Sequence, residues 1–292
     1  MRVFWALFSG LLIAAPAMQP GRGEGVGPIS GDCGPPPADP VALARQVRET
    51  LRREYAQPRQ FTYLEKRRDV DISRLGKVTV GPLRTFEVYP APNDDEYKRL
   101  IAVDGKPLDP EELARRDAEH AHNLQRQAER ERTEPPHRRA SRLKKEADER
   151  RERDAILDDA VAVFEVSFVC RETFDAEPVI VLSLKPRPNA RVSTREGDWM
   201  KKLQGRMWVS QDGHHIARLQ LQAFEDLSIG WGVVARVEAG SGFDYIRKRI
   251  GDAWLPSELK LEGSGRTLLF RQFQVKTVTT YTNHQPYKPN GS

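Results

Sequence analysis

Short runs of alternating apolar and polar residues recur along the chain and predict a protein rich in β-strands. The segment 178–186 (PVIVLSLKP) is β-branched and apolar and ends in a Lys-Pro step, and a charged connection at 198–203 leads to a strand that closes with an Asp-Gly turn at 212–213. These features predict a strand, a crossing segment and a second strand. The expected later strands, each with one apolar face, lie at 216–223, 233–239, 243–250, 254–262 and 266–281.

Three further strands are expected nearer the N-terminus, at 60–72, 77–89 and 97–103. Gly76 and a Pro- and Asp-rich cluster at 90–95 separate them, and these residues favour turns rather than helices. A meander of antiparallel strands is the simplest arrangement.

Two segments carry the signals of helix starts. An Asp-Pro pair at 39–40 supplies an N-cap and a first-turn proline for an amphipathic helix over about 41–56, and a second Asp-Pro pair at 109–110 opens another helical segment. Apolar residues return at helical spacing from 156, and the chain changes to strand before 170. Because the strands leave one apolar face, we expect the helices to cover it.

The segment 109–154 is a highly charged helical insertion, with 13 basic and 13 acidic residues among its 46. Because these charges cancel, the net charge of +5 lies elsewhere, which argues against nucleic-acid binding, since that needs net positive charge on one face. The pattern predicts a solvated helical hairpin, broken by two prolines at 135–136 and supported by ion pairs one helical turn apart. A weak alanine stripe could pack on another surface but would not hold a strong coiled coil.

The N-terminus predicts export. Arg2 precedes an apolar stretch at 3–15, and small residues end at Ala17, so residues 1–17 are expected to be a signal peptide cleaved near Ala17. A retained N-terminal anchor is the alternative, although the stretch is short for a membrane span. We expect a periplasmic protein with a disordered leader at 18–40 and no transmembrane segment in the mature chain.

The chain has two cysteines, Cys33 and Cys170. An exported protein can keep a disulfide, so one bond between them is a candidate, and two unlinked thiols are the alternative.

The sequence predicts no catalytic, metal or cofactor site. His214 and His215 are adjacent in an expected turn, and His120 and His122 point to different sides of an expected helix, so neither pair converges on a metal. The chain has no HExxH, paired-cysteine or phosphate-loop motif, and the Gly-Ser-Gly at 240–242 is not a nucleophile elbow. We therefore expect a protein that is not an enzyme and needs no cofactor.

The order of elements resembles the outer-membrane lipoprotein carrier family (LolA/LolB-like), with its related RseB-type regulator domains. The resemblance rests on an exported chain, a helix before the first strand, helices inserted between two sets of strands, and the passage from 182–186 (LSLKP) to 205–209 (GRMWV). The matched motif residues are Lys185-Pro186, Trp208, Asp212-Gly213 and Trp254-Leu255-Pro256.

The resemblance covers about 41–284 and implies an α+β protein: a curved antiparallel sheet forming an incomplete β-barrel covered by helices. It implies a single domain over these residues, with 285–292 as a tail. The insertion at 109–154 is longer than the lid helices of typical carriers, and no acyl-contacting or arginine latch residue of the family can be matched within it. The resemblance therefore supports the fold more than the cargo.

We expect a non-enzymatic periplasmic binder or carrier of lipid or lipoprotein acyl chains in a hydrophobic half-barrel cavity. A packed core and a lipid cavity use the same side chains, so both remain open for the candidate residues. These candidates are Leu182, Leu184, Met207, Val209, Leu219, Leu221, Leu259 and Leu261. The alternative is an envelope interaction or stress-sensor scaffold that docks a protein partner through its charged helices.

Overall fold

The computed structural model describes residues 35–37, 39–57, 60–72, 77–91, 95–229, 235–267 and 271–287. The expected signal peptide, most of the expected leader and Cys33 lie outside these residues.

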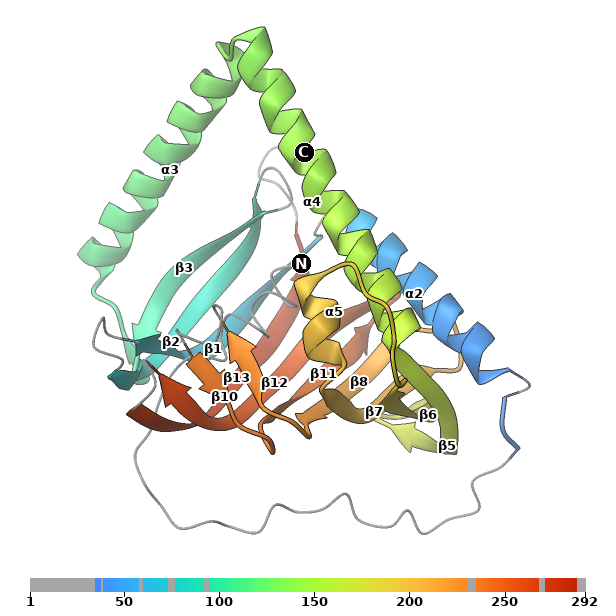
Figure 1. Cartoon of the computed structure of the whole chain (residues 1–292). Coiled ribbons are helices and arrows are strands. Elements are labelled where there is room, and N and C mark those ends of the chain that lie inside the picture. Colours follow the sequence, from blue (N-terminus) through green and yellow to red (C-terminus); the bar gives the residue numbers. More distant parts are fainter. Residues whose placement is uncertain are drawn as a thin grey trace.

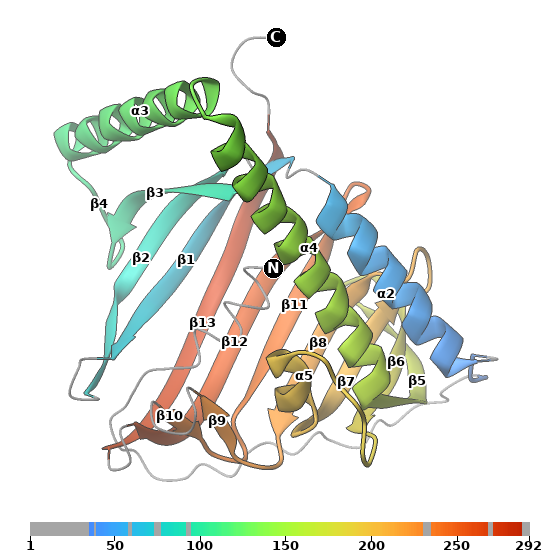
Figure 2. The ribbon, with the colours of Figure 1, turned by 45° about the horizontal axis from the view of Figure 1, so that its top comes forward.

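In the described residues, thirteen strands form one antiparallel sheet that makes up the body of the protein (Figure 1). The strands pair in the order β4-β3-β2-β1-β13-β12-β11-β8-β7-β6-β5, and β9 and β10 branch from β12. The strands are β1 (Phe61–Ile72), β2 (Val78–Ala91), β3 (Asp95–Val103), β4 (Lys106–Pro107), β5 (Phe164–Phe174), β6 (Glu177–Pro186), β7 (Leu203–Ser210), β8 (Ile216–Ala223), β9 (Leu227–Ile229), β10 (Ala235–Val237), β11 (Gly242–Ile250), β12 (Ala253–Thr267) and β13 (Arg271–Pro286). Because β4 and β5 end this order and the sheet is strongly curved, the strands form an incomplete barrel, as expected (Figure 2).

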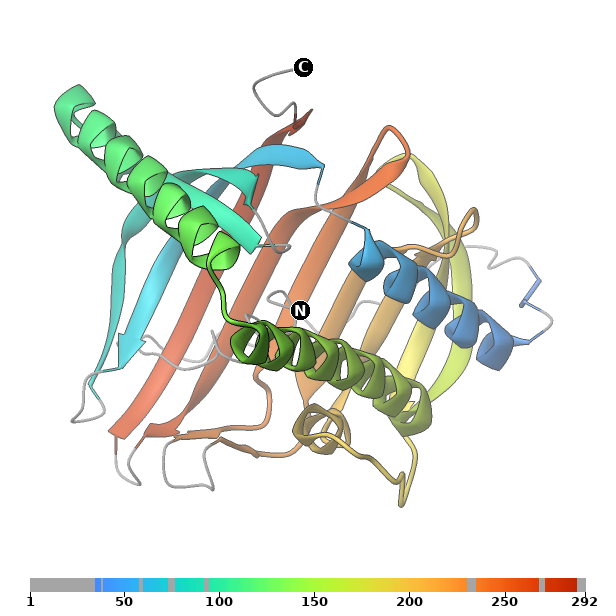
Figure 3. The same ribbon diagram turned by 90° about the horizontal axis from the view of Figure 1, so that it is seen from above.

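The described helices are α2 (Pro40–Ala56), α3 (Pro110–Arg132), α4 (Pro136–Val163) and α5 (Arg195–Met200). Both expected helix starts are confirmed. The Asp39 carboxylate accepts hydrogen bonds from the backbone N–H groups of Val41, at 2.8 Å, and Ala42, at 3.0 Å. Asp109 accepts one from the N–H of Glu111 at 2.8 Å. The helices α2, α4 and α5 lie on the concave side of the sheet (Figure 3).

The inserted helices do not form a closed hairpin. They break at Pro135 and Pro136 as expected, but α3 runs alongside β3 whereas α4 descends to the concave side, so the two diverge from their common apex (Figures 1 and 2). Arg99 of β3 holds Asp117 of α3 through two hydrogen bonds of 2.8 Å. The charge pattern and the proline break predict two adjacent helices. They do not show that each helix packs on a different part of the sheet.

Several elements differ from the sequence-based expectation. The crossing at 198–203 begins within the short helix α5, and the short strands β4 and β9 were not foreseen. The strand expected at 233–239 is described only as the short β10, which pairs with β9 and β12. Finally, β13 continues to Pro286, two residues into the expected tail.

Two glycines let the backbones on either side of β8 approach it closely. A Cβ atom on Gly205 of β7 would lie 1.9 Å from the carbonyl oxygen of Gln220. A Cβ on Gly242 of β11 would lie 2.5 Å from the carbonyl oxygen of Leu221. A side chain at either position would collide with backbone, so this part of the curved sheet requires glycine.

We propose that Cys170 forms a disulfide with Cys33. Cys170 is fully buried on the convex face, on the edge strand β5. The next residue, Arg171, donates a hydrogen bond from Nε to the carbonyl oxygen of Pro35 at 3.1 Å, which brings the chain two residues after Cys33 to this edge. Such a bond would close a long loop and stabilise the protein by roughly 3–5 kcal/mol.

Intact-mass measurement tests this pairing. Without reductant we expect a mass two hydrogens below that of the reduced chain, and reduction should lower the melting temperature. Cys170→Ser should lower it equally without reductant. Two thiols that react fully with an alkylating agent in the unreduced, denatured protein would contradict the pairing.

Candidate functional site

The predicted acyl-contacting residues lie together on the concave face. Strand register places Met207 opposite Leu182 on one side and opposite Leu219 on the other. All eight belong to one apolar cluster: Leu182, Leu184, Met207, Val209, Leu219, Leu221 and Leu259 are buried, and Leu261 packs against them half-buried. The sheet therefore joins residues that are up to 79 positions apart into one apolar surface.

Helix side chains complete this apolar cluster over part of the face. Leu43 and Val47 of α2 belong to it, as do Ile156 of α4 and Trp199 and Met200 of α5. Under these helices the residues of β6, β7 and β8 form a packed core.

Toward β12 and β13 the concave face extends beyond α2 and α5 (Figures 2 and 3). Here Leu259 and Leu261 continue the apolar surface on β12, and Phe273 and Val275 continue it on β13. The apolar cluster therefore continues from β6, β7 and β8 onto β12 and β13.

Beyond β13, the strand β1 puts polar side chains on the concave face. Glu65 of β1 is 1% exposed, and its two carboxylate oxygens contact different cations: Oε1 lies 3.0 Å from Arg67 Nη1, and Oε2 pairs with Lys98 Nζ. Tyr63 donates a hydrogen bond to Glu96 at 2.6 Å. The opposite charges compensate one another, as a buried carboxylate requires.

Sequence reasoning missed this polar end because it followed the apolar residues of β1. The overlooked signal is the alternation of Tyr63, Glu65, Arg67 and Asp69, which puts polar residues on one face of the strand. Only the pairing of Glu65 with Tyr281 of β13 shows that this face is the concave one.

A buried ion network fastens the end of α2 to the sheet. Glu54 Oε2 lies 3.0 Å from Arg247 Nη2, and Glu54 Oε1 lies 2.6 Å from His215 Nδ1. Arg247 also donates to the carbonyl oxygen of Trp254 at 2.5 Å. In addition, Thr50 donates to the carbonyl oxygen of Gly213 at 2.8 Å. The turn that carries His215 therefore anchors the helix.

Burial of Glu54 favours its neutral form, but the hydrogen bond with His215 and the charge of Arg247 outweigh this and hold its pKa below the ordinary value. The ionised carboxylate is thus the form that the folded protein stabilises.

A second buried carboxylate joins α4 to α5. Asp159 accepts hydrogen bonds from the backbone N–H groups of Ser193, at 3.0 Å, and Thr194, at 2.8 Å, and from the Thr194 hydroxyl at 2.6 Å. Thr194 in turn caps α5 by accepting from the N–H of Gly197 at 3.0 Å. Burial opposes ionisation of Asp159, yet these hydrogen bonds lower its pKa.

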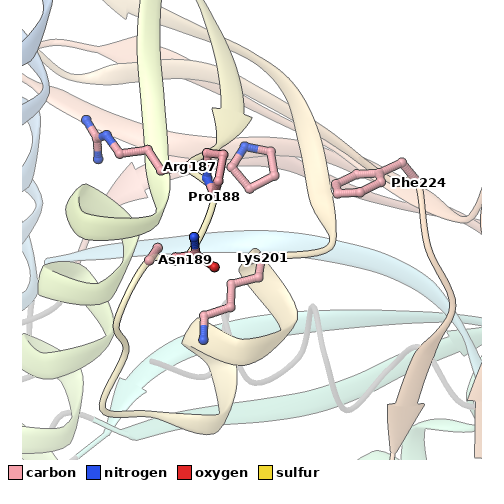
Figure 4. Close-up of a pocket in the computed structure, with 7 residues that line it drawn as sticks. Arg187, Pro188, Asn189, Lys201 and Phe224 are labelled. Carbon is pink, nitrogen blue, oxygen red and sulfur yellow. The ribbon is translucent and has the colours of Figure 1, made fainter.

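Two surface hollows lie at the rim rather than over the apolar cluster. The larger, of about 430 Å³, lies beside α5, with Arg187 and Phe224 at opposite ends (Figure 4). The smaller, of about 340 Å³, lies between α2 and His214.

Among the residues that the structure describes, no group of three or more His, Cys, Asp or Glu is placed to hold a metal ion. In the same part of the chain, no helix combines the length and apolar character needed to cross a membrane.

The ion network at Glu54 gives a testable pH dependence. A lowered folded-state pKa means that Glu54 stabilises the protein above its unfolded pKa, and that this contribution is lost as the pH falls through the folded value. Glu54→Gln should destabilise the protein by about 3 kcal/mol at neutral pH and reduce the loss of stability on acidification, measured by denaturant unfolding.

Glu49→Gln is the matched control, because Glu49 is on the same helix with its side chain 55% exposed. We expect little change from it. Equal stability and equal pH profiles for the two variants would contradict the anchoring role of Glu54.

Comparison with known proteins finds solved structures alone: no family model and no curated protein matches the chain. A LolA superfamily protein from Nitrosomonas europaea is 8% identical, covers 87% of this chain and 96% of its own, and has a TM-score of 0.27. A putative outer membrane lipoprotein-sorting protein domain from Vibrio parahaemolyticus is 9% identical, covers 83% and 93%, and has a TM-score of 0.28. A DUF1329 family protein from Desulfovibrio piger is 11% identical, covers 85% and 94%, and has a TM-score of 0.27.

Proposed function

We propose that this protein is a non-enzymatic periplasmic binder or carrier of lipid or lipoprotein acyl chains. The observation that carries the proposal is the continuous apolar surface on the concave face of an unclosed sheet, which runs along the strand order from β6 to β13. An acyl chain needs apolar width and no catalytic group. Each buried methylene contributes about 0.8 kcal/mol, so a chain lying along several strands would bind firmly.

The cargo would enter beside Leu259 and Leu261 and extend toward Leu221 beneath the helices. Side chains of α2 and α5 occupy that space in the structure, so binding requires them to move aside. The ion network of α2 is confined to its C-terminal end, at Thr50 and Glu54, which leaves the Leu43 end with fewer polar ties to the sheet.

The polar end of the concave face supports binding rather than catalysis. Both carboxylate oxygens of Glu65 are engaged by cations, and the Tyr63 hydroxyl is engaged by Glu96. A carboxylate that acts as a general base needs an oxygen free to accept a proton from a substrate, and both oxygens of Glu65 are already paired.

Displaceable binding of a fluorescent fatty acid tests the proposal. Leu261→Asn should weaken binding at least about tenfold, because it puts a polar side chain at a half-buried position of the apolar surface. Lys260→Gln is the control, since the neighbouring side chain points to the opposite face of β12. Absence of fatty-acid binding by the unchanged protein would refute the proposal.

A second candidate function is an envelope interaction or stress-sensor scaffold. The observation that favours it is that α3 buries none of its residues, although it spans Pro110–Arg132. A helix of that length, tied to β3 at Asp117 but with none of its residues buried, offers a surface to a partner protein.

Deletion of 112–152 separates the two functions. A carrier should keep fatty-acid binding after this deletion, because the cluster residues of β6, β7, β8 and β12 remain. Loss of capture of envelope proteins with intact fatty-acid binding would assign the insertion to partner docking. Loss of fatty-acid binding in a folded deletion variant would contradict a cavity built by the sheet.

A further inference from the structure

The apex where α3 meets α4 stands well away from the sheet (Figure 1). We call residues 126–145 the arm tip. Its side chains are exposed to solvent, apart from the half-buried Glu134 and Arg142. The arm tip therefore contributes nothing to the core.

The zero net charge of the insertion conceals a separation of charge. The arm tip holds eight basic and three acidic residues, a net charge of +5. The flank at 109–125 holds two basic and five acidic residues, and the flank at 146–154 holds three basic and five acidic. Positive charge is thus concentrated at the part of the arm farthest from the sheet.

Helix stability does not explain this concentration. In the described part of the chain, Arg130, Arg138, Arg139 and Lys144 form no ion pair. The first turn of α4 has no acidic residue, and its N-cap, Pro135, makes no side-chain hydrogen bond. Cations near a helix N-terminus oppose the helix dipole, so Arg138 and Arg139 weaken the start of α4 without a compensating ion pair in the described part of the chain. Such a local conflict points to an external partner.

Two large apolar side chains accompany the positive charge. Leu143, within the arm tip, is 47% exposed, and Leu124, just before it, is 36% exposed. Both are held in helices that keep them at the surface.

We propose that the arm tip docks on an anionic lipid bilayer surface. The basic residues lie on more than one side of α4, which suits the diffuse charge of a bilayer better than one shaped protein partner. Leu124 and Leu143 can enter the boundary between headgroups and acyl chains, a contact that a nucleic acid does not offer. This docking is independent of cargo in the concave face.

Co-sedimentation of the full chain with vesicles tests the docking. Binding is expected with phosphatidylcholine–phosphatidylglycerol vesicles, not with phosphatidylcholine alone, and should weaken as salt is added. Combining Arg138→Gln, Arg139→Gln and Lys144→Gln should lower the partition coefficient at least about tenfold.

The matched control combines Arg115→Gln, Arg150→Gln and Arg151→Gln, which remove the same charge outside the arm tip. It should bind as the unchanged protein does, and circular dichroism should show equal helicity in both variants. Equal losses in the two variants, or equal binding to uncharged vesicles, would overturn the proposal.

The leucines distinguish a bilayer from another polyanion. Leu124→Ser with Leu143→Ser should reduce the partition coefficient about tenfold at unchanged net charge. Unreduced partition, or binding of duplex DNA by a protein that ignores anionic vesicles, would overturn docking on a membrane.

Discussion

The structure depends on one constraint: a curved sheet that does not close must keep its apolar concave face from water. Closed barrels fill their interior with their own side chains, but here β4 and β5 remain far apart in the strand order. Helices from two distant parts of the chain therefore complete the core. The apolar face beneath them continues across β12 and β13, and this continuous apolar face is the candidate site.

The cover is fastened by polar groups at a few points. Glu54 meets Arg247 and His215 at the end of α2, and Asp159 joins α4 to the loop that starts α5. Burial disfavours the ionised form of each carboxylate. Hydrogen bonds, with neighbouring charges at Glu54, outweigh this and lower the pKa of each group. Apolar contacts thus supply most of the attraction, whereas these carboxylates fix the position of each helix.

The helix α4 joins two parts of different character. The C-terminal part of α4 supplies Ile156 and Val163 to the core, so this part is structural. The arm tip is solvated and positively charged, and this charge is the basis of its proposed docking on an anionic bilayer. Because both parts belong to one continuous helix, contacts at the arm tip bear on the same helix that covers the concave face.

The sequence by itself determined most of the longer elements and the eight candidate residues, which share one apolar cluster. It could do so because period-two alternation and Asp-Pro helix starts are local signals that tertiary packing here leaves intact. It also determined the charge separation within 109–154, although the sum over the whole segment hides it.

Only the tertiary structure decided which side chains meet. The Glu54 network joins residues that are 161 and 193 positions apart, and no local pattern encodes such a contact. Likewise, pairing with β13 decides that the polar face of β1 is the one on the concave side. The helix α3 lies against β3, where Arg99 donates a hydrogen bond to Asp117. The local pattern specifies which face of an element is apolar, whereas strand order and helix placement specify what that face contacts.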